Sequence, residues 1–331
     1  MKKIIYVLLL IAIIVGGFYF LSDVFNKTKT VTEEVTEQKS TKIKENADKK
    51  MVDQANDKDS QQTYTPAMWK IEHKGKTSYL FGSIHVGEKD MYPLPENVLQ
   101  AFSETEVLAV EANIVNVNQM EMARMVQEMA MDLENPLPTV LSDKTREQYE
   151  VFCEKQTSTC NLVKIFEPWM AAMTIEAMSV IQLGYSEDLG IDKFFINGSK
   201  EKEIVELESL EGQLKLLDGM PKELQDYMVL GAVTKDANDF KDLMQSWKTG
   251  QMEQVMAQAE ADSKAMGIPT DVMNEFNDLF LYKRNKVMAD GIAAQMEQGK
   301  SVFAVVGAAH YAGKNSVQQY LEEKGFTIER L

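Results

Sequence analysis

Hydrophobic and polar residues alternate at both ends of the folded part of this chain in a pattern that predicts short strands. Residues 68–72 and 77–81 are expected to form a β-hairpin, and His73 in or beside its turn is interpreted as a solvated loop residue. Apolar runs at 107–110 and 302–306 predict two more strands. The N-terminal and C-terminal ends of the folded part therefore both contribute to a sheet.

The same order of elements follows two of these strands. Gly82-Ser83-Ile84-His85 comes directly after one strand, and Gly307-Ala308-Ala309-His310 comes directly after another. Helical patterns follow at 93–104 and 314–324, and closing strands at 107–110 and 326–328. We therefore predict an α/β fold whose central sheet is built from two strand-GxxH-helix-strand halves, with a large helical insertion between them.

The insertion, about residues 117–299, has a mainly helical pattern. Its expected helices lie at 120–130, 169–183, 224–233, 240–247, 252–259 and 273–296. Its many methionines are interpreted as core residues, as is Trp169, because methionine fills irregular gaps in a core. One strand-like run, residues 203–208, interrupts the helices. We expect it to add a strand to the sheet and to bring Glu208 to the pocket that receives the histidines.

Two of the chain's three histidines, His85 and His310, thus occupy matching places just past the end of a strand. Glycine tolerates backbone angles that other residues resist, so each strand is expected to end in a sharp turn. Open α/β sheets bind ligands at the carboxyl ends of their strands, and neutral imidazole is a common metal ligand and general base. A lone histidine there more often satisfies a buried hydrogen bond, but the matched pair favours one shared site.

The first 65 residues differ in character from the rest of the chain. Residues 4–21 are uninterruptedly apolar and follow Lys2 and Lys3. Such a run can span a bilayer, and it also fits a cleaved signal peptide. The bulky residues at its end favour an uncleaved anchor, residues 1–21, with the lysines inside. Residues 22–65 are polar and are expected to be a disordered tether for a domain at 66–331.

This organisation predicts a single-pass protein of the cell membrane, with its domain on the extracytoplasmic side, or a secreted domain if the signal is cleaved. The formal net charge of −16 argues against nucleic acid as a partner and against docking on anionic lipid. In an oxidising compartment Cys153 and Cys160 fit a local disulfide, and two unrelated thiols fit the sequence equally well.

Seven pieces of the sequence occur together in the order typical of one family. They are MWKIEHKGKTSYLFGSIHVG, LAVEANI, EPWMAAM, LGID, IVELESLEGQ, YKRNKVMADGI and FAVVGAAHYAGKNSVQQYLEEKGF. On these pieces, over about residues 67–331, the chain resembles the TraB/GumN family, which includes PrgY and the Tiki proteases. The resemblance implies a metal-dependent hydrolase, with a peptide favoured over another small molecule as substrate, and manganese or cobalt as the divalent metal. Histidine and carboxylate ligands also suit zinc or iron.

Carried onto this sequence, the resemblance implies that His85, His310 and a glutamate, Glu111 or Glu208, hold the metal. Three protein ligands with an open position are typical of a catalytic metal site. We assign Glu111 to the metal and Glu208 to the role of general base, although the sequence does not decide between the two.

The remaining residues that the resemblance implies are Arg284 and Asn285. Arg284 is expected to stabilise the oxyanion, or alternatively only to pair with a buried Glu111, and Asn285 to orient the substrate or the reacting water. Asp192, in the LGID piece, is interpreted as a helix cap. Haem-binding relatives in the wider superfamily imply an alternative function, in which the same pocket binds a peptide or haem without hydrolysis.

Overall fold

The structure is a computed structural model and describes residues 64–331. The predicted anchor, residues 1–21, and nearly all of the predicted tether lie outside the described residues. Within 64–331, no helix combines the length and apolar character that crossing a membrane requires. The anchor, its orientation and the domain boundary at residue 66 therefore stay predictions.

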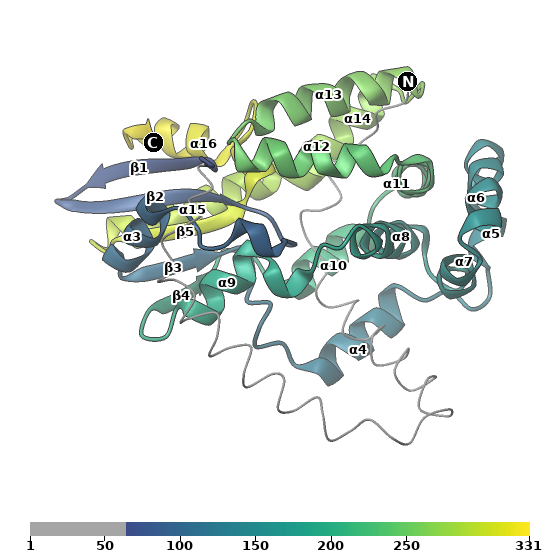
Figure 1. Ribbon diagram of the computed structural model, residues 1–331, viewed down its shortest axis with the longest axis horizontal. Coiled ribbons are helices and arrows are strands. Elements are labelled where there is room, and N and C mark those ends of the chain that lie inside the picture. Colours follow the sequence, from purple (N-terminus) through teal and green to yellow (C-terminus); the bar gives the residue numbers. More distant parts are fainter. Residues whose placement is uncertain (1–63) are drawn as a thin grey trace.

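One sheet forms the centre of the described part of the chain (Figure 1). Its strands are β1 (Met68–His73), β2 (Lys76–Ser83), β3 (Val107–Val110), β4 (Glu203–Glu206), β5 (Val302–Gly307) and β6 (Ile328–Arg330). They lie in the order β4-β3-β5-β2-β1-β6. The strands β4, β3, β5 and β2 are mutually parallel, and β1 runs antiparallel between β2 and β6. The predicted α/β fold is confirmed, as are the hairpin and the strand at Glu203–Glu206.

The two predicted halves interleave around the middle of the sheet. In the first half, β2 leads through α3 (Glu96–Glu104) to β3, which pairs with β5 rather than with β2. In the second half, β5 leads through α16 (Val317–Glu323) to β6 at the far edge. The strands β2 and β5 are consequently neighbours, with Ser83 opposite Gly307 in parallel register. Both GxxH motifs therefore leave the sheet side by side at the same edge.

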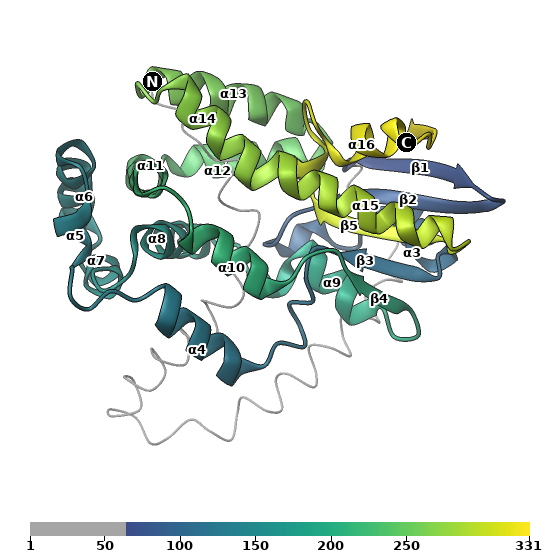
Figure 2. The ribbon, with the colours of Figure 1, turned by 180° about the vertical axis from the view of Figure 1, so that it is seen from behind.

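Helices cover both faces of the sheet, because its strands bury side chains on both sides. Figure 2 shows α15 (Lys283–Glu297) and α16 over one face, and Figure 1 shows α3 and α9 (Ile191–Gly198) over the other. Each face of the sheet has its own hydrophobic core, and alternate residues of β3 point into the two cores. Val107 and Ala109 belong to the core on the α15 side, and Leu108 and Val110 to the core on the opposite side. The apolar run in β3 is thus explained by burial on both faces.

The predicted helical insertion lies beside the sheet as a separate group of helices (Figure 1). Between β3 and β4 these are α4 (Gln119–Met129), α5 (Leu137–Val140), α6 (Asp143–Lys155), α7 (Thr157–Val163) and α8 (Pro168–Gln182). After β4 they are α10 (Leu210–Asp218), α11 (Lys222–Thr234), α12 (Ala237–Lys248), α13 (Met252–Ala265) and α14 (Thr270–Asn277). A disulfide between Cys153 and Cys160 joins α6 to α7, which decides the alternative left open by the sequence.

The long helix expected at 273–296 is not uniform. It consists of α14, a π-helical turn at Asp278–Tyr282, and α15. A π-helical turn shifts the side chains that follow it, and such turns are frequent at functional sites. This one ends at Tyr282, two residues before Arg284.

Two single-residue interpretations have different outcomes. Trp169 is completely buried, so its place in the core is confirmed. The interpretation of His73 as a solvated loop residue is wrong. His73 is the last residue of β1, its Nε2 lies 3.2 Å from Glu297 Oε1, and its ring packs on Phe326 at 4.7 Å between centroids. The hairpin turn is two residues shorter than the sequence suggested, because β1 extends to His73 and β2 begins at Lys76, so His73 stays on the strand and is half-buried.

Candidate functional site

The carboxyl ends of the four parallel strands carry the polar residues that the sequence singled out. Glu111 follows β3 directly, Glu208 comes two residues after β4, and His85 two residues after β2. His310 comes three residues after β5, in the short 3-10 turn Ala308–Tyr311. Because parallel strands end at one edge, four segments distant in sequence meet there.

Close packing explains the glycine of the first motif. The expectation that both glycines adopt unusual backbone angles is wrong, since neither Gly82 nor Gly307 has a positive φ. A Cβ on Gly82 would instead lie 3.1 Å from Cβ of Ala308. The two GxxH turns therefore touch, and Gly82 permits that contact. On its other side, the indole of Trp247 donates a hydrogen bond to the Gly82 carbonyl at 2.9 Å.

Arg284 joins the two glutamates at this edge. Its Nη2 lies 2.9 Å from Glu111 Oε2 and 2.6 Å from Glu208 Oε2, and its Nε donates to Glu208 Oε1 at 2.9 Å. Its Nη1 donates to the carbonyl of Phe280, in the π-helical turn, at 3.1 Å. All three nitrogens of this buried guanidinium are thus occupied. The contacts favour the alternative in which Arg284 pairs with carboxylates, and its oxyanion role stays a prediction.

Glu111 connects this charge cluster to both histidine arms. Its Oε1 accepts the backbone N–H of Gly307 at 2.7 Å and lies 3.8 Å from Nε2 of His310. Burial raises the pKa of Glu111, although the attraction of Arg284 opposes the shift. Gln213 adds a contact at 3.4 Å to Glu111 and one at 3.1 Å to Glu208 through its Nε2. Since carboxylates only accept hydrogen bonds, the amide of Gln213 is fixed in orientation.

His310 is completely buried and is oriented by Asn285. The amide Nδ2 of Asn285 donates to the carbonyl of Asn315 at 2.7 Å, so its Oδ1 faces His310 Nδ1 and accepts from it. Nδ1 therefore carries the proton. Nε2 is buried with no hydrogen-bond partner among the described residues. Burial, aided by the charges of Arg284 and His85, lowers the pKa of His310 well below its ordinary value, so the ring is neutral.

His85 is oriented by Asp192, whose interpretation as a helix cap is wrong. The N-cap of α9 is Gly190, and Asp192 lies inside the helix. Its Oδ2 lies 2.9 Å from His85 Nδ1, and its Oδ1 accepts a hydrogen bond from Ser83 Oγ at 2.7 Å. Burial alone would raise the pKa of Asp192, but His85 and Ser83 outweigh it and leave that pKa below its ordinary value.

The sequence placed all six predicted residues at this edge and missed three of their partners. Ser83, Asp192 and Gln213 are buried; Asp192 contacts His85, Gln213 contacts Glu111, and Ser83 donates to Asp192. Each stood inside a piece that resembles the family, but nothing in its spacing marked it. Asp192 reaches the site from the first turn of α9, and only the fold shows that the segment leading into this helix lies against the first GxxH motif.

The side chains at this site are of the types that bind divalent cations, but they are not yet close enough together to hold one. Over residues 64–331, no group of three or more His, Cys, Asp or Glu side chains is close enough to hold a metal ion. The unpartnered Nε2 of His310 nevertheless faces a carboxylate oxygen of Glu111, and this pair of donors suits several divalent metals. The three-ligand set of His85, Glu111 and His310 therefore stays a prediction.

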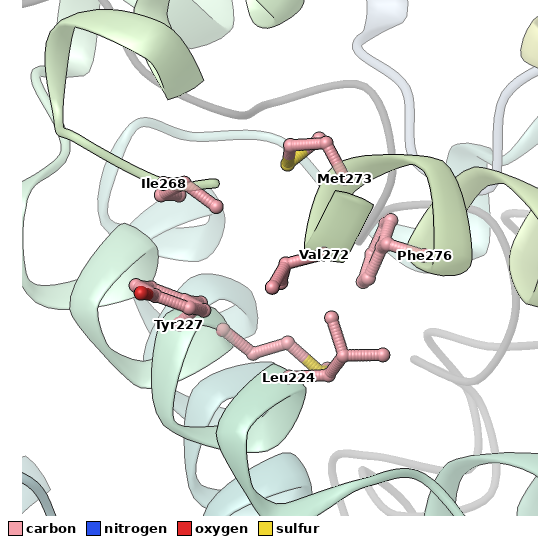
Figure 3. A pocket seen from close by; sticks show the side chains of 7 residues that line it. Leu224, Tyr227, Ile268, Val272, Met273 and Phe276 are labelled. Carbon is pink, nitrogen blue, oxygen red and sulfur yellow. The ribbon is translucent and has the colours of Figure 1, made fainter. Parts of the chain in front are cut away.

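An apolar pocket lies away from these residues, between α11 and the start of α14 (Figure 3). Its walls are Leu224, Tyr227, Met228, Ile268, Val272, Met273 and Phe276. Only Tyr227 among them carries an oxygen or nitrogen in its side chain. The pocket contains none of the predicted site residues and offers no chemistry for bond cleavage.

Comparison with known proteins defines the class to which this fold and site belong. Residues 67–330 match the model of the TraB/PrgY/gumN family, and the chain belongs to that family. It is similar to the uncharacterized protein YbaP of Escherichia coli K12, with 26% identity over 250 residues, covering 73% of this chain and 87% of YbaP. YbaP of Shigella flexneri is 26% identical over 251 residues, covering 74% and 87%.

An uncharacterized protein of Treponema pallidum is 25% identical over 178 residues, covering 52% of this chain and 53% of that protein. No solved structure matches the chain. The names of these relatives state no activity, and what the comparisons establish is the family.

Proposed function

We propose that this protein is an extracytoplasmic metal-dependent hydrolase, with peptides as its favoured substrates. The observation that carries the proposal is the way the two motif histidines are held. His85 and His310 each present Nδ1 to a buried side-chain oxygen, that of Asp192 in one case and of Asn285 in the other. Metal-binding histidines are typically held in this way, because a proton fixed on one ring nitrogen leaves the lone pair on the other.

Exposure distinguishes the roles of the two glutamates. The side chain of Glu111 is 5% exposed and borders His310, whereas that of Glu208 is 14% exposed. We therefore assign Glu111 to the metal, beside His85 and His310, and Glu208 to proton transfer with solvent or substrate. A divalent ion bound there, manganese or cobalt by resemblance, would supply Lewis-acid polarisation of a substrate carbonyl.

Arg284 and Gln213 support this division of roles. Arg284 neutralises part of the charge of both glutamates and, through one shared nitrogen, keeps the two carboxylates next to each other. Gln213 donates to both carboxylates through its Nε2 and so links them a second time. The disulfide between Cys153 and Cys160 supports an oxidising compartment, which agrees with the predicted extracytoplasmic location.

The test is the metal content and turnover of the purified full-length protein. We expect elemental analysis to find about one manganese or cobalt ion per chain after reconstitution, and a His85→Ala/His310→Ala variant to lose it. His73→Ala is the matched control, because His73 is the chain's third histidine and pairs with Glu297 away from the site. Equal metal content in the double variant and the wild type would contradict the proposal. Metal or haem binding without turnover of any peptide in a library would support the alternative of a binding protein.

A further inference from the structure

The loop that carries His85 is joined closely to a segment outside both motifs. Gly87 and Ser186 exchange a pair of backbone hydrogen bonds, each 2.9 Å long. The N–H of Ile191 donates to the carbonyl of Ile84, also at 2.9 Å. The segment at 186–192 thus lies along the first GxxH turn and continues into α9.

Glycine at two positions makes this approach possible. A Cβ on Gly87 would lie 2.1 Å from the carbonyl oxygen of Leu189, and a Cβ on Gly190 would lie 2.2 Å from that of His85. Both contacts are with backbone, which cannot move aside as a flexible side chain would. The two segments are therefore in direct backbone contact around His85.

Asp192 enters the site from this contact. It follows Gly190 by two residues, is 4% exposed, and places Oδ2 at 2.9 Å from His85 Nδ1. Its other oxygen accepts from Ser83 Oγ at 2.7 Å, and Ser83 is 2% exposed. A carboxylate can only accept, so Ser83 donates to Asp192, and a proton on His85 Nδ1 faces an acceptor oxygen. This arrangement favours the tautomer of a neutral His85 that carries its proton on Nδ1.

We infer that Asp192 is a positioning residue that fixes the tautomer and direction of the His85 ring, with Ser83 fixing Asp192. The inference rests on the proposed function, since a ring fixed in this way serves to direct Nε2 at a metal. The neutral Asn285 holds His310 in the same tautomer, so the two arms differ in charge. His85 is the arm with the anionic partner, and loss of such a partner typically weakens metal affinity by about 10–100-fold.

The experiment measures the ring tautomer and the metal affinity separately. Nitrogen-15 spectra of the imidazoles are recorded on metal-stripped full-length protein at about pH 9, where ordinary imidazoles are neutral. The chain has only three histidines, so His85→Gln assigns the His85 signals. Affinity for Mn²⁺ and Co²⁺ is measured by calorimetric titration. The variants are Asp192→Ala, which removes the acceptor, and Asp192→Asn, which keeps an acceptor oxygen but removes the charge.

Asp188→Asn is the matched control, because Asp188 lies in the same segment but is 74% exposed and pairs with Lys193. We expect His85 to be protonated on Nδ1 in the wild type and in Asp188→Asn. In Asp192→Ala we expect the Nε2–H form to appear and metal affinity to fall by about 10–100-fold. Asp192→Asn should also weaken metal affinity, because the charge is gone. A tautomer change in a folded Asp192→Ala separates positioning from a merely structural role.

Two results would overturn the inference: an unchanged His85 tautomer in Asp192→Ala, or metal affinities of Asp192→Ala and Asp192→Asn equal to that of the wild type. If Asp192→Ala does not fold, Asp192→Asn decides alone, with weaker affinity expected and equal affinity contradicting. A wild type that binds no metal would contradict the proposed function and not the orientation, because the tautomer spectra need no metal.

Discussion

Replacing Arg284 by methionine removes the one cation that joins the two glutamates of the site. The change keeps much of the side-chain volume but leaves Glu111, which is 5% exposed, and Glu208, which is 14% exposed, without their shared partner. Removing one partner of a buried ion pair costs about 3–5 kcal/mol of unfolding free energy. Glu111 keeps the N–H of Gly307 and the amide of Gln213, so we expect the lower half of that range.

The loss should depend on pH in a direction that the structure fixes. Burial already raises the pKa of Glu111 above its ordinary value of 4.5, and removing Arg284 raises it further. Above pH 4.5 the unfolded carboxyl is ionised while the folded one still binds a proton, so the folded state loses stability as pH rises through the raised pKa. We therefore expect a smaller deficit at about pH 5 than at about pH 8.

Urea denaturation of Arg284→Met at both pH values measures this deficit, with metal content measured beside it. Arg284→Met combined with Glu111→Gln is the matched control and should recover part of the stability, because the unpaired buried charge is gone. A loss below about 1 kcal/mol in Arg284→Met, with fold and metal retained and turnover abolished, would refute the reasoning. It would return Arg284 to the oxyanion role that the sequence suggested.

Three further changes test other parts of the structure. Gly190→Ala should cost about 1–3 kcal/mol in thermal unfolding, because its Cβ would meet the His85 carbonyl at 2.2 Å, whereas Gly231→Ala, with open space around it, should not destabilise. Hydrogen bonds from Ser301 lower the pKa of Glu106 to about 2. Glu106 therefore adds stability that disappears as pH falls from 4.5 to about 2. In Glu106→Gln the unfolding free energy should fall less over this pH range, by about 1 kcal/mol or less, because the group is exposed. A pH dependence equal to that of the wild type would contradict this. Reducing the Cys153–Cys160 disulfide should lower stability by about 2–3 kcal/mol, with no effect of reductant on the double serine variant.

The sequence predicted the elements of the sheet more fully than their order. The strands stood out because their residues are apolar and short runs of them end at glycine or glutamate, and even the isolated strand at Glu203–Glu206 was predicted. The pairing of β3 with β5 was not, because both neighbours of β5 are apolar and no local pattern distinguishes them. Strand order depends on contacts between residues far apart in sequence, which periodicity does not encode.

The same distinction holds for the candidate site. His85, Glu111, Glu208 and His310 could be placed together because each follows a predicted strand. Asp192 could not, because it reaches His85 through backbone contacts between two loops more than one hundred residues apart. The π-helical turn before Arg284 was also hidden, since its residues continue the apolar pattern of an α-helix.

The central claim is that His85 and His310, from neighbouring parallel strands, hold one metal ion. A crystal structure of the full-length protein soaked with Mn²⁺ or Co²⁺, with anomalous scattering recorded at the metal edge, tests it most directly. We predict one anomalous peak in contact with Nε2 of both rings, at about 2.0–2.1 Å for a zinc-sized ion and somewhat farther for a larger one. Absence of a peak there, or ring nitrogens more than about 8 Å apart in the metal-soaked crystal, would contradict the account, because no single ion reaches both at that separation.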